Sequence, residues 1–356
     1  MAGEGGRPVG VGMLVAGFIG EFHTLGLRYV PDTRVVAHAD ASPERREAFA
    51  ARFGSRPFDS IAGLCADPDV DLVVVSLPNH LHREAVLAAA AAGKAVACTK
   101  PLGRNAAEAL EMLRAVRAAG VFSSYLENVV FNLDMMRLRE MIEAGAIGRV
   151  TTVRAREGHS GPHAAHFWDA ELAGGGALLD MASHGTEVAR YLLGKEIAVR
   201  EVFAWGATLV HGARTTGEDN AVMIVRFEDG RAATCDVSWT SKGGLEGRFE
   251  VSGDAGRLVH DMGTGSIRAF IERPAGYLGE KADAETGWVF PVPDEVRVHG
   301  HDAMMADVIG AFRAGTRPGE TFEDGYVVNC VLDAAYRSMR SGRWEPVEID
   351  EEVAAG

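Results

Sequence analysis

The chain has 356 residues, of which 47% are hydrophobic and 24% are charged, and its formal net charge at pH 7 is -14. This length exceeds what one hydrophobic core usually serves, so we expect two domains, and the composition is that of a globular protein rather than a disordered one. The acidic balance argues against nucleic-acid partners, because binding a phosphate backbone needs a basic face.

The first residues, Met1 to Arg7, lack the basic and then apolar order of a secretion signal. The chain contains no uninterrupted run of about 18 apolar residues, so we expect no membrane partner. The cysteines lack the spacing of a zinc site or the density of a disulfide scaffold and fit reduced thiols; they are Cys65, Cys98, Cys235 and Cys330. Together these features predict a cytoplasmic protein.

From Val9 to about Asn128, short β-branched runs alternate with alanine-rich helical stretches, which predicts a parallel sheet flanked by helices. The predicted strands are Val9 to Val15, Thr33 to Ala39, Leu72 to Ser76, Ala95 to Cys98 and Val121 to Tyr125. The predicted helices include Glu21 to Tyr29, Ser42 to Phe53 and Leu81 to Ala92. The fold class is therefore α/β, with a doubly wound Rossmann domain over residues 1–128.

Residues 129–356 follow a different rhythm, which predicts an α+β domain with a large, mostly antiparallel open sheet covered by helices on one face. A first helix is expected from Leu133 to Ala144, and Arg273 to Pro293 is expected to be loop. The predicted strands are Val150 to Glu157, Ala221 to Phe227, Ala232 to Trp239 and Phe249 to Ser252. Two closing helices are expected, at His301 to Ala314 and Phe322 to Ser341.

The first predicted strand runs into the sequence Val15-Ala16-Gly17-Phe18-Ile19-Gly20, which precedes a helix. Glycine lets a backbone approach a pyrophosphate, and the amides at the start of the helix attract that anion. Asp40 ends the second strand, where a carboxylate can accept the ribose hydroxyls of NAD and repel the 2′-phosphate of NADP. Arg45 competes with this preference, because it could turn toward such a phosphate, and an ordinary strand-helix turn is the alternative to a cofactor site.

Two further loops lie at the carboxyl ends of predicted strands, where ligands of open α/β sheets collect. They are Ser76-Leu77-Pro78-Asn79-His80 and Cys98-Thr99-Lys100-Pro101-Leu102. Lys100 is a candidate functional cation, although a solvated surface lysine is the alternative. The predicted cofactor-binding residues are Gly17, Phe18, Ile19, Gly20, Asp40, Ala41, Arg45, Ser76, Leu77, Pro78, Asn79, His82, Thr99, Lys100, Glu127 and Asn128. For Glu127 and Asn128, packing at a domain junction is the alternative.

Three glycines, Gly174 to Gly176, predict a tight loop feeding a helix that begins near Leu178. Asp180 and His184 then fall at i and i+4 on one helical face. A histidine with an aligned carboxylate can remove a hydroxyl proton while hydride leaves the same carbon. The alternative is an ion pair on a surface helix.

The segment from Glu157 to Asp169 is not periodic and contains His159, His163, His166 and Trp168. The aromatic ring could stack on a sugar and the imidazoles could bind hydroxyls, so His159, His163 and Trp168 join Lys100, Asn128, Asp180 and His184 as predicted substrate-binding residues. A metal site with Asp180 or His184 and a purely structural loop are the alternatives. No recognised ligand spacing is complete, so we expect no metal.

Several of these motifs resemble the glucose-fructose oxidoreductase / inositol dehydrogenase / MocA family over nearly the whole chain. The similar segments are Ala16 to His23, Ser76 to His82, Lys100-Pro101, Ile147 to Val150, Gly174 to His184 and Leu332 to Ser338. The resemblance implies a Rossmann domain, an α/β domain whose open sheet often mediates a homodimer or homotetramer, and NAD(P)-dependent oxidation of sugars, cyclitols or related polyols.

By the same resemblance, Lys100, Asp180 and His184 match the family's catalytic residues, and Asp40 matches its ribose-binding carboxylate. Two positions depart from it: Val15 replaces a glycine of the phosphate turn, and Thr99 stands where glutamate is common. We expect an NAD-dependent dehydrogenase of a sugar, glycoside or cyclitol. The alternative is a redox-neutral enzyme that oxidises a sugar carbon transiently to cleave a glycoside or invert a centre. A regulatory module without catalysis would leave Lys100, Asp180 and His184 without a task.

Overall fold

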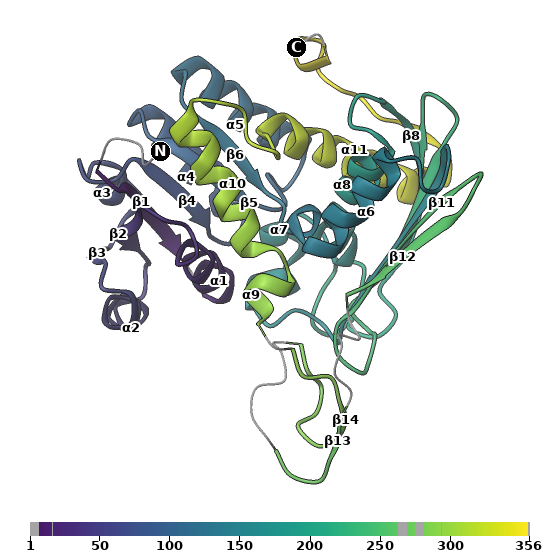
Figure 1. Ribbon diagram of the computed structural model, residues 1–356, viewed down its shortest axis with the longest axis horizontal. Coiled ribbons are helices and arrows are strands. Elements are labelled where there is room, and N and C mark those ends of the chain that lie inside the picture. Colours follow the sequence, from purple (N-terminus) through teal and green to yellow (C-terminus); the bar gives the residue numbers. More distant parts are fainter. Residues whose placement is uncertain (1–6, 16, 263–268, 275–280, 293, 355–356) are drawn as a thin grey trace. The chain divides into compact units, whose positions relative to one another are not determined.

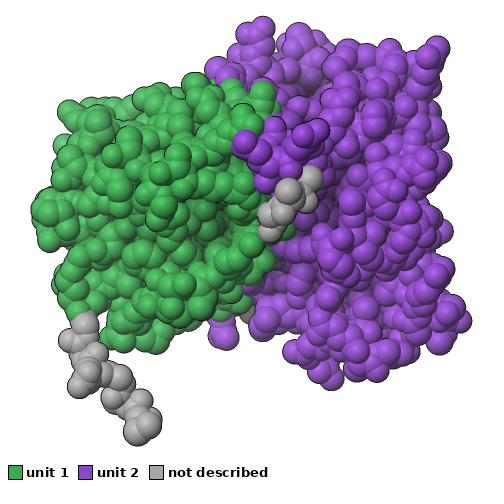
Figure 2. Space-filling model, turned by 90° about the horizontal axis from the view of Figure 1, so that it is seen from above, with its two compact units in different colours: residues 1–103, 107–128, 300–326 green, residues 104–106, 129–299, 327–356 purple. Residues whose placement is uncertain are grey.

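The computed structural model describes residues 7–15, 17–262, 269–274, 281–292 and 294–354, so Ala16 and Met1 to Gly6 lie outside the described residues. The chain divides into two compact units, coloured separately in Figure 2. Unit 1 comprises residues 1–103, 107–128 and 300–326, and unit 2 comprises residues 104–106, 129–299 and 327–356. The predicted domains, 1–128 and 129–356, differ from these units in the placement of residues 104–106 and 300–326 and stay a prediction.

Unit 1 contains the predicted parallel sheet, in the order β3-β2-β1-β4-β5-β6 (Figure 1). It has six strands rather than the five that the sequence predicts, because the short strand β3 was not among them. Every residue of its first strand is buried, as expected for a parallel strand covered on both faces. The strand bounds are β1 Val9–Val15, β2 Thr33–Ala39, β3 Arg56–Phe58, β4 Leu72–Ser76, β5 Ala95–Thr99 and β6 Ser123–Leu126. Because all strands run in one direction, their carboxyl ends meet at one edge of the sheet.

Helices connect these strands, and one comes from far along the chain. Ser42 caps the second helix by accepting a hydrogen bond from the Arg45 amide. The tenth helix packs on the first (Figure 1), where Phe22 and His301 form an edge-to-face contact with ring centroids 5.3 Å apart. The helices are α1 Phe18–Leu27, α2 Pro43–Phe53, α3 Ile61–Cys65, η1 Asn79–Leu81, α4 His82–Ala91, α5 Ala106–Ala119 and α10 His301–Ala314.

Unit 2 is built on a seven-stranded sheet in the order β12-β11-β7-β10-β9-β8-β15. Only the β10-β7 pair is parallel, so the prediction of a mostly antiparallel sheet is confirmed. The strands are β7 Val150–Gly158, β8 Val199–Ala207, β9 Asn220–Phe227, β10 Ala232–Ser238, β11 Glu246–Gly253, β12 Arg257–Asp261 and β15 Glu345–Pro346. The sequence analysis missed β8 and β12, whose apolar residues are interrupted by polar ones.

The prediction of loop from Arg273 to Pro293 is wrong in part, because strand β14, Gly287–Val289, pairs there with β13, Ala269–Ile271. Residues 275–280 and 293 of that segment lie outside the described residues. The remaining elements are η2 Val129–Phe131, α6 Leu133–Glu143, η3 Ala165–Trp168, α7 Ala170–Ala173, α8 Ala177–Leu193, α9 Glu295–Val298, α11 Phe322–Ser341 and α12 Glu351–Ala354.

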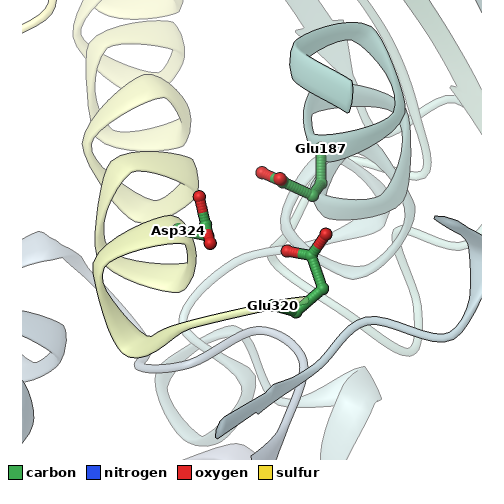
Figure 3. Close-up of side chains that lie close together, drawn as sticks. All are labelled: Glu187, Glu320 and Asp324. Carbon is green, nitrogen blue, oxygen red and sulfur yellow. The ribbon is translucent and has the colours of Figure 1, made fainter. Parts of the chain in front are cut away.

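Helix α11 begins with a reciprocal cap. The Asp324 carboxylate accepts hydrogen bonds from the amide and hydroxyl of Thr321, at 3.0 and 2.8 Å, and the Thr321 hydroxyl accepts from the Asp324 amide. Figure 3 shows Asp324 in this first turn and Glu320 in the segment just before it. None of the helices in the described part of the chain has the length and hydrophobicity needed to cross a membrane.

Helix α8 packs on strands β7, β9 and β10 and is buried at every position except Tyr191. The contact is closest at Gly185, where an added Cβ would lie 2.8 Å from the Cys235 sulfur and 3.1 Å from the Ala155 Cβ. A glycine inside a helix costs about 1 kcal/mol relative to alanine. At Gly185 this cost permits the close approach of helix and sheet.

We therefore expect Gly185→Ala to destabilise the protein by about 1 to 3 kcal/mol, because overpacking in a dense core outweighs the gain in helix propensity. Gly310 on α10 is the matched control, since an added Cβ there meets nothing within 4 Å. Gly310→Ala should leave stability unchanged or raise it by up to about 1 kcal/mol. Denaturant unfolding of the two variants measures both values, and equal stabilisation by both would contradict the packing argument.

Candidate functional site

The turn between β1 and α1 has the backbone conformation that the phosphate-binding prediction requires. Gly17 has a φ of 148°, a region that side chains disfavour, and an added Cβ would find nothing within 4 Å. It is the N-cap of α1 and has no side chain to cover the amides of the first turn. Val15, the departure from the family pattern, fits here because its side chain packs on Gly20, whose Cβ would lie 2.5 Å from it.

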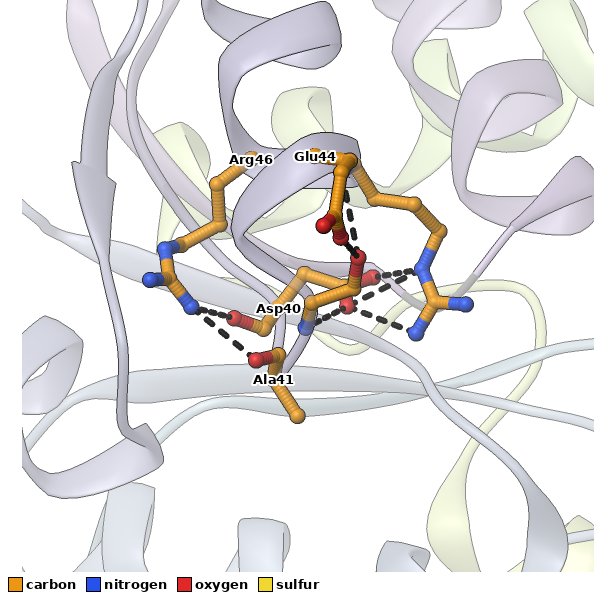
Figure 4. Close-up of polar contacts among 6 residues, drawn as sticks. Asp40, Ala41, Glu44 and Arg46 are labelled. Atoms are coloured by element: carbon orange, nitrogen blue, oxygen red, sulfur yellow. Dashed lines mark hydrogen bonds and ion pairs between the residues drawn. The ribbon is translucent and has the colours of Figure 1, made fainter.

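Asp40 directly follows β2 and is only 5% exposed. Its carboxylate accepts hydrogen bonds from the Arg45 guanidinium at 2.8 to 3.0 Å and from the Ser42 amide at 2.9 Å (Figure 4). Arg46 donates to the carbonyl oxygens of Asp40 and Ala41 at 2.7 and 3.2 Å. The predicted ribose carboxylate therefore lies in a turn that carries two arginines, and Arg45, the residue that competes with the NAD preference, is paired with it.

His82 holds together the two other loops predicted to bind cofactor. Its Nε2 lies 2.8 Å from the Leu77 carbonyl oxygen, and its Nδ1 lies 3.0 and 3.2 Å from those of Pro101 and Leu102. Carbonyl oxygens only accept hydrogen bonds, so full satisfaction needs a proton on both ring nitrogens. Burial lowers the pKa of His82, and the three carbonyls oppose this. The ring therefore ties the loop after β4 to the loop after β5.

His23 on α1 makes a second link to the end of β4, which the sequence analysis did not assign. Its Nδ1 lies 2.7 Å from the Ser76 hydroxyl, and burial lowers its pKa to about 3. Ser76 and Asn79 are likewise buried. The neutral His23 ring thus fixes a predicted cofactor residue rather than offering a charge.

The other predicted residues of unit 1 lie where strands β5 and β6 end. Thr99 and Glu127 are buried, whereas Lys100 and Asn128 are half-buried. Lys100 precedes Pro101 through a cis peptide bond. The parallel sheet therefore brings the predicted cofactor residues after β1, β2, β4, β5 and β6 to one edge.

In unit 2, Asp180 and His184 lie one turn apart on α8 and are 7% and 6% exposed. The alternative of an ion pair on a surface helix is therefore wrong. The Asp180 Oδ2 accepts a hydrogen bond of 3.0 Å from the indole Nε1 of the fully buried Trp239. Sequence reasoning missed Trp239, because only the fold brings the end of β10 to this helix.

His159 also faces Asp180. Its Nδ1 accepts a hydrogen bond of 3.0 Å from the Gly161 amide, so a neutral ring carries its proton on Nε2. That nitrogen lies 4.0 Å from the Asp180 Oδ2. Backbone geometry thus fixes the tautomer of His159 and directs its N–H toward the carboxylate.

The rest of the histidine-containing loop is arranged differently. His163 is exposed, and His166 contacts Phe167 with the two rings tilted and their centroids 4.3 Å apart. Trp168 donates to the Pro162 carbonyl, and the Arg214 guanidinium lies 3.7 Å from its ring centroid. Across the described residues, the histidines of this loop form no group of three ligand atoms within 4.8 Å of one another. The substrate-binding roles of His163 and Trp168 stay predictions.

His299, at the end of α9, is another residue that the sequence analysis missed. Burial lowers its pKa, the nearby Glu295 raises it, and the charge of His184 lowers it. It lines a cavity of about 90 Å³ together with Glu295, Trp288 and Phe290. His299 lies outside every predicted element, and only the fold brings it near His184, so no sequence pattern indicates this neighbour.

The face of the seven-stranded sheet that α8 does not cover exposes large apolar side chains. Trp205 on β8 is 50% exposed and lies opposite Val222 on β9, while Ile224 is 36% exposed on the same strand. Apolar surface of this kind is typical of protein-protein contacts. The expected homodimer or homotetramer through this sheet stays a prediction.

Two family models match most of the chain. Residues 9–126 match the oxidoreductase family with an NAD-binding Rossmann fold, and residues 135–259 match the GFO/IDH/MocA C-terminal domain. The prediction of a NAD-type Rossmann domain followed by this second domain is confirmed.

Relatives cover nearly the full length. The chain is 34% identical to 1,5-anhydro-D-fructose reductase of Ensifer adhaerens, over 88% of this chain and 91% of that protein. It is 28% identical to myo-inositol 2-dehydrogenase of Thermotoga maritima, over 96% and 99%. The crystal structure of GenD2 from gentamicin A biosynthesis in complex with NAD superposes with a TM-score of 0.90 at 30% identity, over 98% and 100%. The structure of levoglucosan dehydrogenase in complex with NADH and levoglucosan superposes with a TM-score of 0.81 at 26% identity, over 96% of this chain and 100% of that chain. The chain therefore belongs to the GFO/IDH/MocA family of oxidoreductases.

Proposed function

We propose that this chain is an NAD-dependent dehydrogenase that oxidises a hydroxyl-bearing carbon of a sugar, glycoside or cyclitol. The observation that carries the proposal is helix α8, which buries Asp180 and His184 on one face with Trp239 bound to the carboxylate. A buried histidine one turn from a held carboxylate suits proton abstraction from a hydroxyl. The relatives named above support the substrate class, because they act on or bind cyclitols, anhydrosugars and NAD.

The residues of unit 1 fit NAD. Gly17 leaves open space beside the first turn of α1, where backbone amides can hold a pyrophosphate, and Asp40 can accept ribose hydroxyls. His82 fixes the loops after β4 and β5, of which the second carries Lys100. When bound, NAD supplies the hydride acceptor.

Three side chains have separate roles in removing the proton from the substrate hydroxyl. We assign His184 to take the hydroxyl proton, because imidazole is the most frequent general base in enzymes. We assign Lys100 the role of the cation that stabilises negative charge developing on the substrate oxygen. Asp180, whose carboxylate accepts a hydrogen bond from the Trp239 indole, orients the His184 ring.

The proposal is tested by mixing purified protein with NAD and a panel of sugars, glycosides and cyclitols while absorbance and sugar products are followed together. We expect NADH to accumulate in amounts equal to oxidised product. Turnover that uses only a bound equivalent of NAD and releases no NADH would instead support the redox-neutral alternative. Absence of both on a broad panel, with NAD bound, would contradict the proposed substrate class.

His184→Ala should lower kcat by about a hundredfold to ten-thousandfold, the usual worth of a positioned general base, while the Kd for NAD stays unchanged. Lys100→Ala should act on the same step, so the two losses should be strongly non-additive in the double variant. His163→Ala is the comparison variant: as a predicted substrate-binding residue in an exposed loop, it should change KM and leave kcat near the wild-type value. Near-wild-type turnover of His184→Ala would contradict the assignment of His184 as general base, and His159 would then be the first candidate for that role.

For the cofactor, we expect NAD to bind more tightly than NADP, because the Asp40 carboxylate opposes a 2′-phosphate. Asp40→Ala should weaken NAD binding by about tenfold to a hundredfold, the worth of hydrogen bonds to a charged group, and should improve NADP binding. Arg45→Ala should weaken NADP binding and spare NAD. Fluorescence titration of both cofactors measures these constants, and tighter binding of NADP to the unchanged protein would reverse the assignment.

A further inference from the structure

The start of helix α8 depends on a residue from another part of unit 2. Its N-cap is Gly176, which has no side chain to bind the free amides of the first turn. Glu218 binds them instead: its Oε1 accepts from the amides of Gly176 and Leu178 at 3.1 and 2.9 Å, and its carbonyl accepts from the Ala177 amide at 2.8 Å. One buried residue thus satisfies three successive amides, and its carboxylate lies at the positive end of the helix.

Tyr336 on α11 holds that carboxylate. Its hydroxyl donates to the Glu218 Oε1 at 3.0 Å and accepts from the Gly176 amide at 3.2 Å. Burial raises the pKa of Glu218, and the hydrogen bonds from Leu178, Tyr336 and Gly176 lower it. The pair therefore forms a closed set of hydrogen bonds with the helix start.

The three glycines before the helix are explained by the same contacts. An added Cβ would lie 1.9 Å from the Tyr336 hydroxyl at Gly175 and 2.1 Å from the Glu218 carbonyl oxygen at Gly176. At Gly174 it would lie 2.6 Å from the backbone of Arg104. The three glycines are therefore needed for the close approach of Arg104, Tyr336 and Glu218 to this segment, as well as for a tight loop.

The same segment also reaches the other partner of Asp180. The carbonyl of Asp219, the residue after Glu218, accepts from the Trp239 amide at 2.8 Å. The Trp239 indole in turn donates to Asp180. Glu218 thus holds the helix that carries Asp180, and Asp219 holds the backbone of the residue whose indole binds Asp180.

We propose that Glu218 and Tyr336 are positioning residues that set the place of Asp180 and His184 by holding the first turn of α8. Neither needs to touch substrate or cofactor. This inference rests on the proposed function for its effect on turnover, whereas its structural part does not.

The experiment compares Glu218→Ala, Glu218→Gln and Tyr336→Phe in the full-length protein. Glu218→Ala removes the acceptor and should lower kcat by up to about a hundredfold, as expected for a small displacement of catalytic groups, with the Kd for NAD unchanged. Glu218→Gln keeps an acceptor oxygen and should restore most of kcat. Tyr336→Phe should lie between these two. Tyr191→Phe, near the far end of α8, is the matched control and should keep the wild-type kcat.

A second readout does not need activity. Nitrogen-15 spectra resolve the indole N–H signals of the five tryptophans. The Trp239 signal should shift in Glu218→Ala and stay in place in Tyr191→Phe. An unmoved Trp239 signal, or a wild-type kcat in folded Glu218→Ala, would overturn the inference. If the wild-type protein turns over nothing on the panel, the proposed function fails, and the Trp239 shift still decides the role of Glu218.

Discussion

The burial of helix α8 is the constraint on which the rest of unit 2 depends. A helix packed on a sheet along its whole length has no water to bind its polar groups, so each must find a partner in the protein. Glu218 supplies partners at its start, Trp239 binds Asp180, and Arg190 pairs with the buried Glu187 near its end. Glu218 and Trp239 come from two other segments, whereas Arg190 lies on α8 itself. The start of the helix can therefore keep one position only while both of those segments are in place.

Unit 1 solves a related problem with loops. Ligands of a parallel sheet gather where strands end, and those ends are connected by segments that carry few backbone hydrogen bonds of their own. His82 supplies bonds between two such loops, and His23 ties α1 to Ser76. Both histidines act as rigid structural links, and their burial keeps them from serving as exposed acids or bases. The loop that carries Lys100 is therefore held by His82, a residue that the sequence analysis assigns to cofactor contact.

Local sequence patterns predicted most helices and strands, but not the hydrogen bonds that join residues far apart in the sequence. Strands β1, β2 and β4 have the predicted bounds, because continuous β-branched runs bounded by turns have few other conformations. The helix carrying Asp180 and His184 also follows from its glycines and spacing. Glu218, Trp239 and Tyr336 lie 40 to 160 positions from the residues they bind, so no spacing rule reveals them. Strand β14 was missed because a three-residue strand among glycines and prolines carries almost no periodic pattern.

This division suggests where the chain can vary. Asp180 is fixed by a helix, a strand end and a buried indole, whereas His163 is exposed and Trp168 is held on its loop by Arg214 and a backbone carbonyl. Under the proposed function, changes at His163 or Trp168 would alter the side chains offered to a substrate, and neither residue takes part in the hydrogen bonds of Glu218 with α8. Changes at Glu218 or Trp239 alter the placement of Asp180 for every substrate alike. Selectivity among polyols should therefore reside in the exposed loop, while the chemistry common to them depends on residues that no substrate touches.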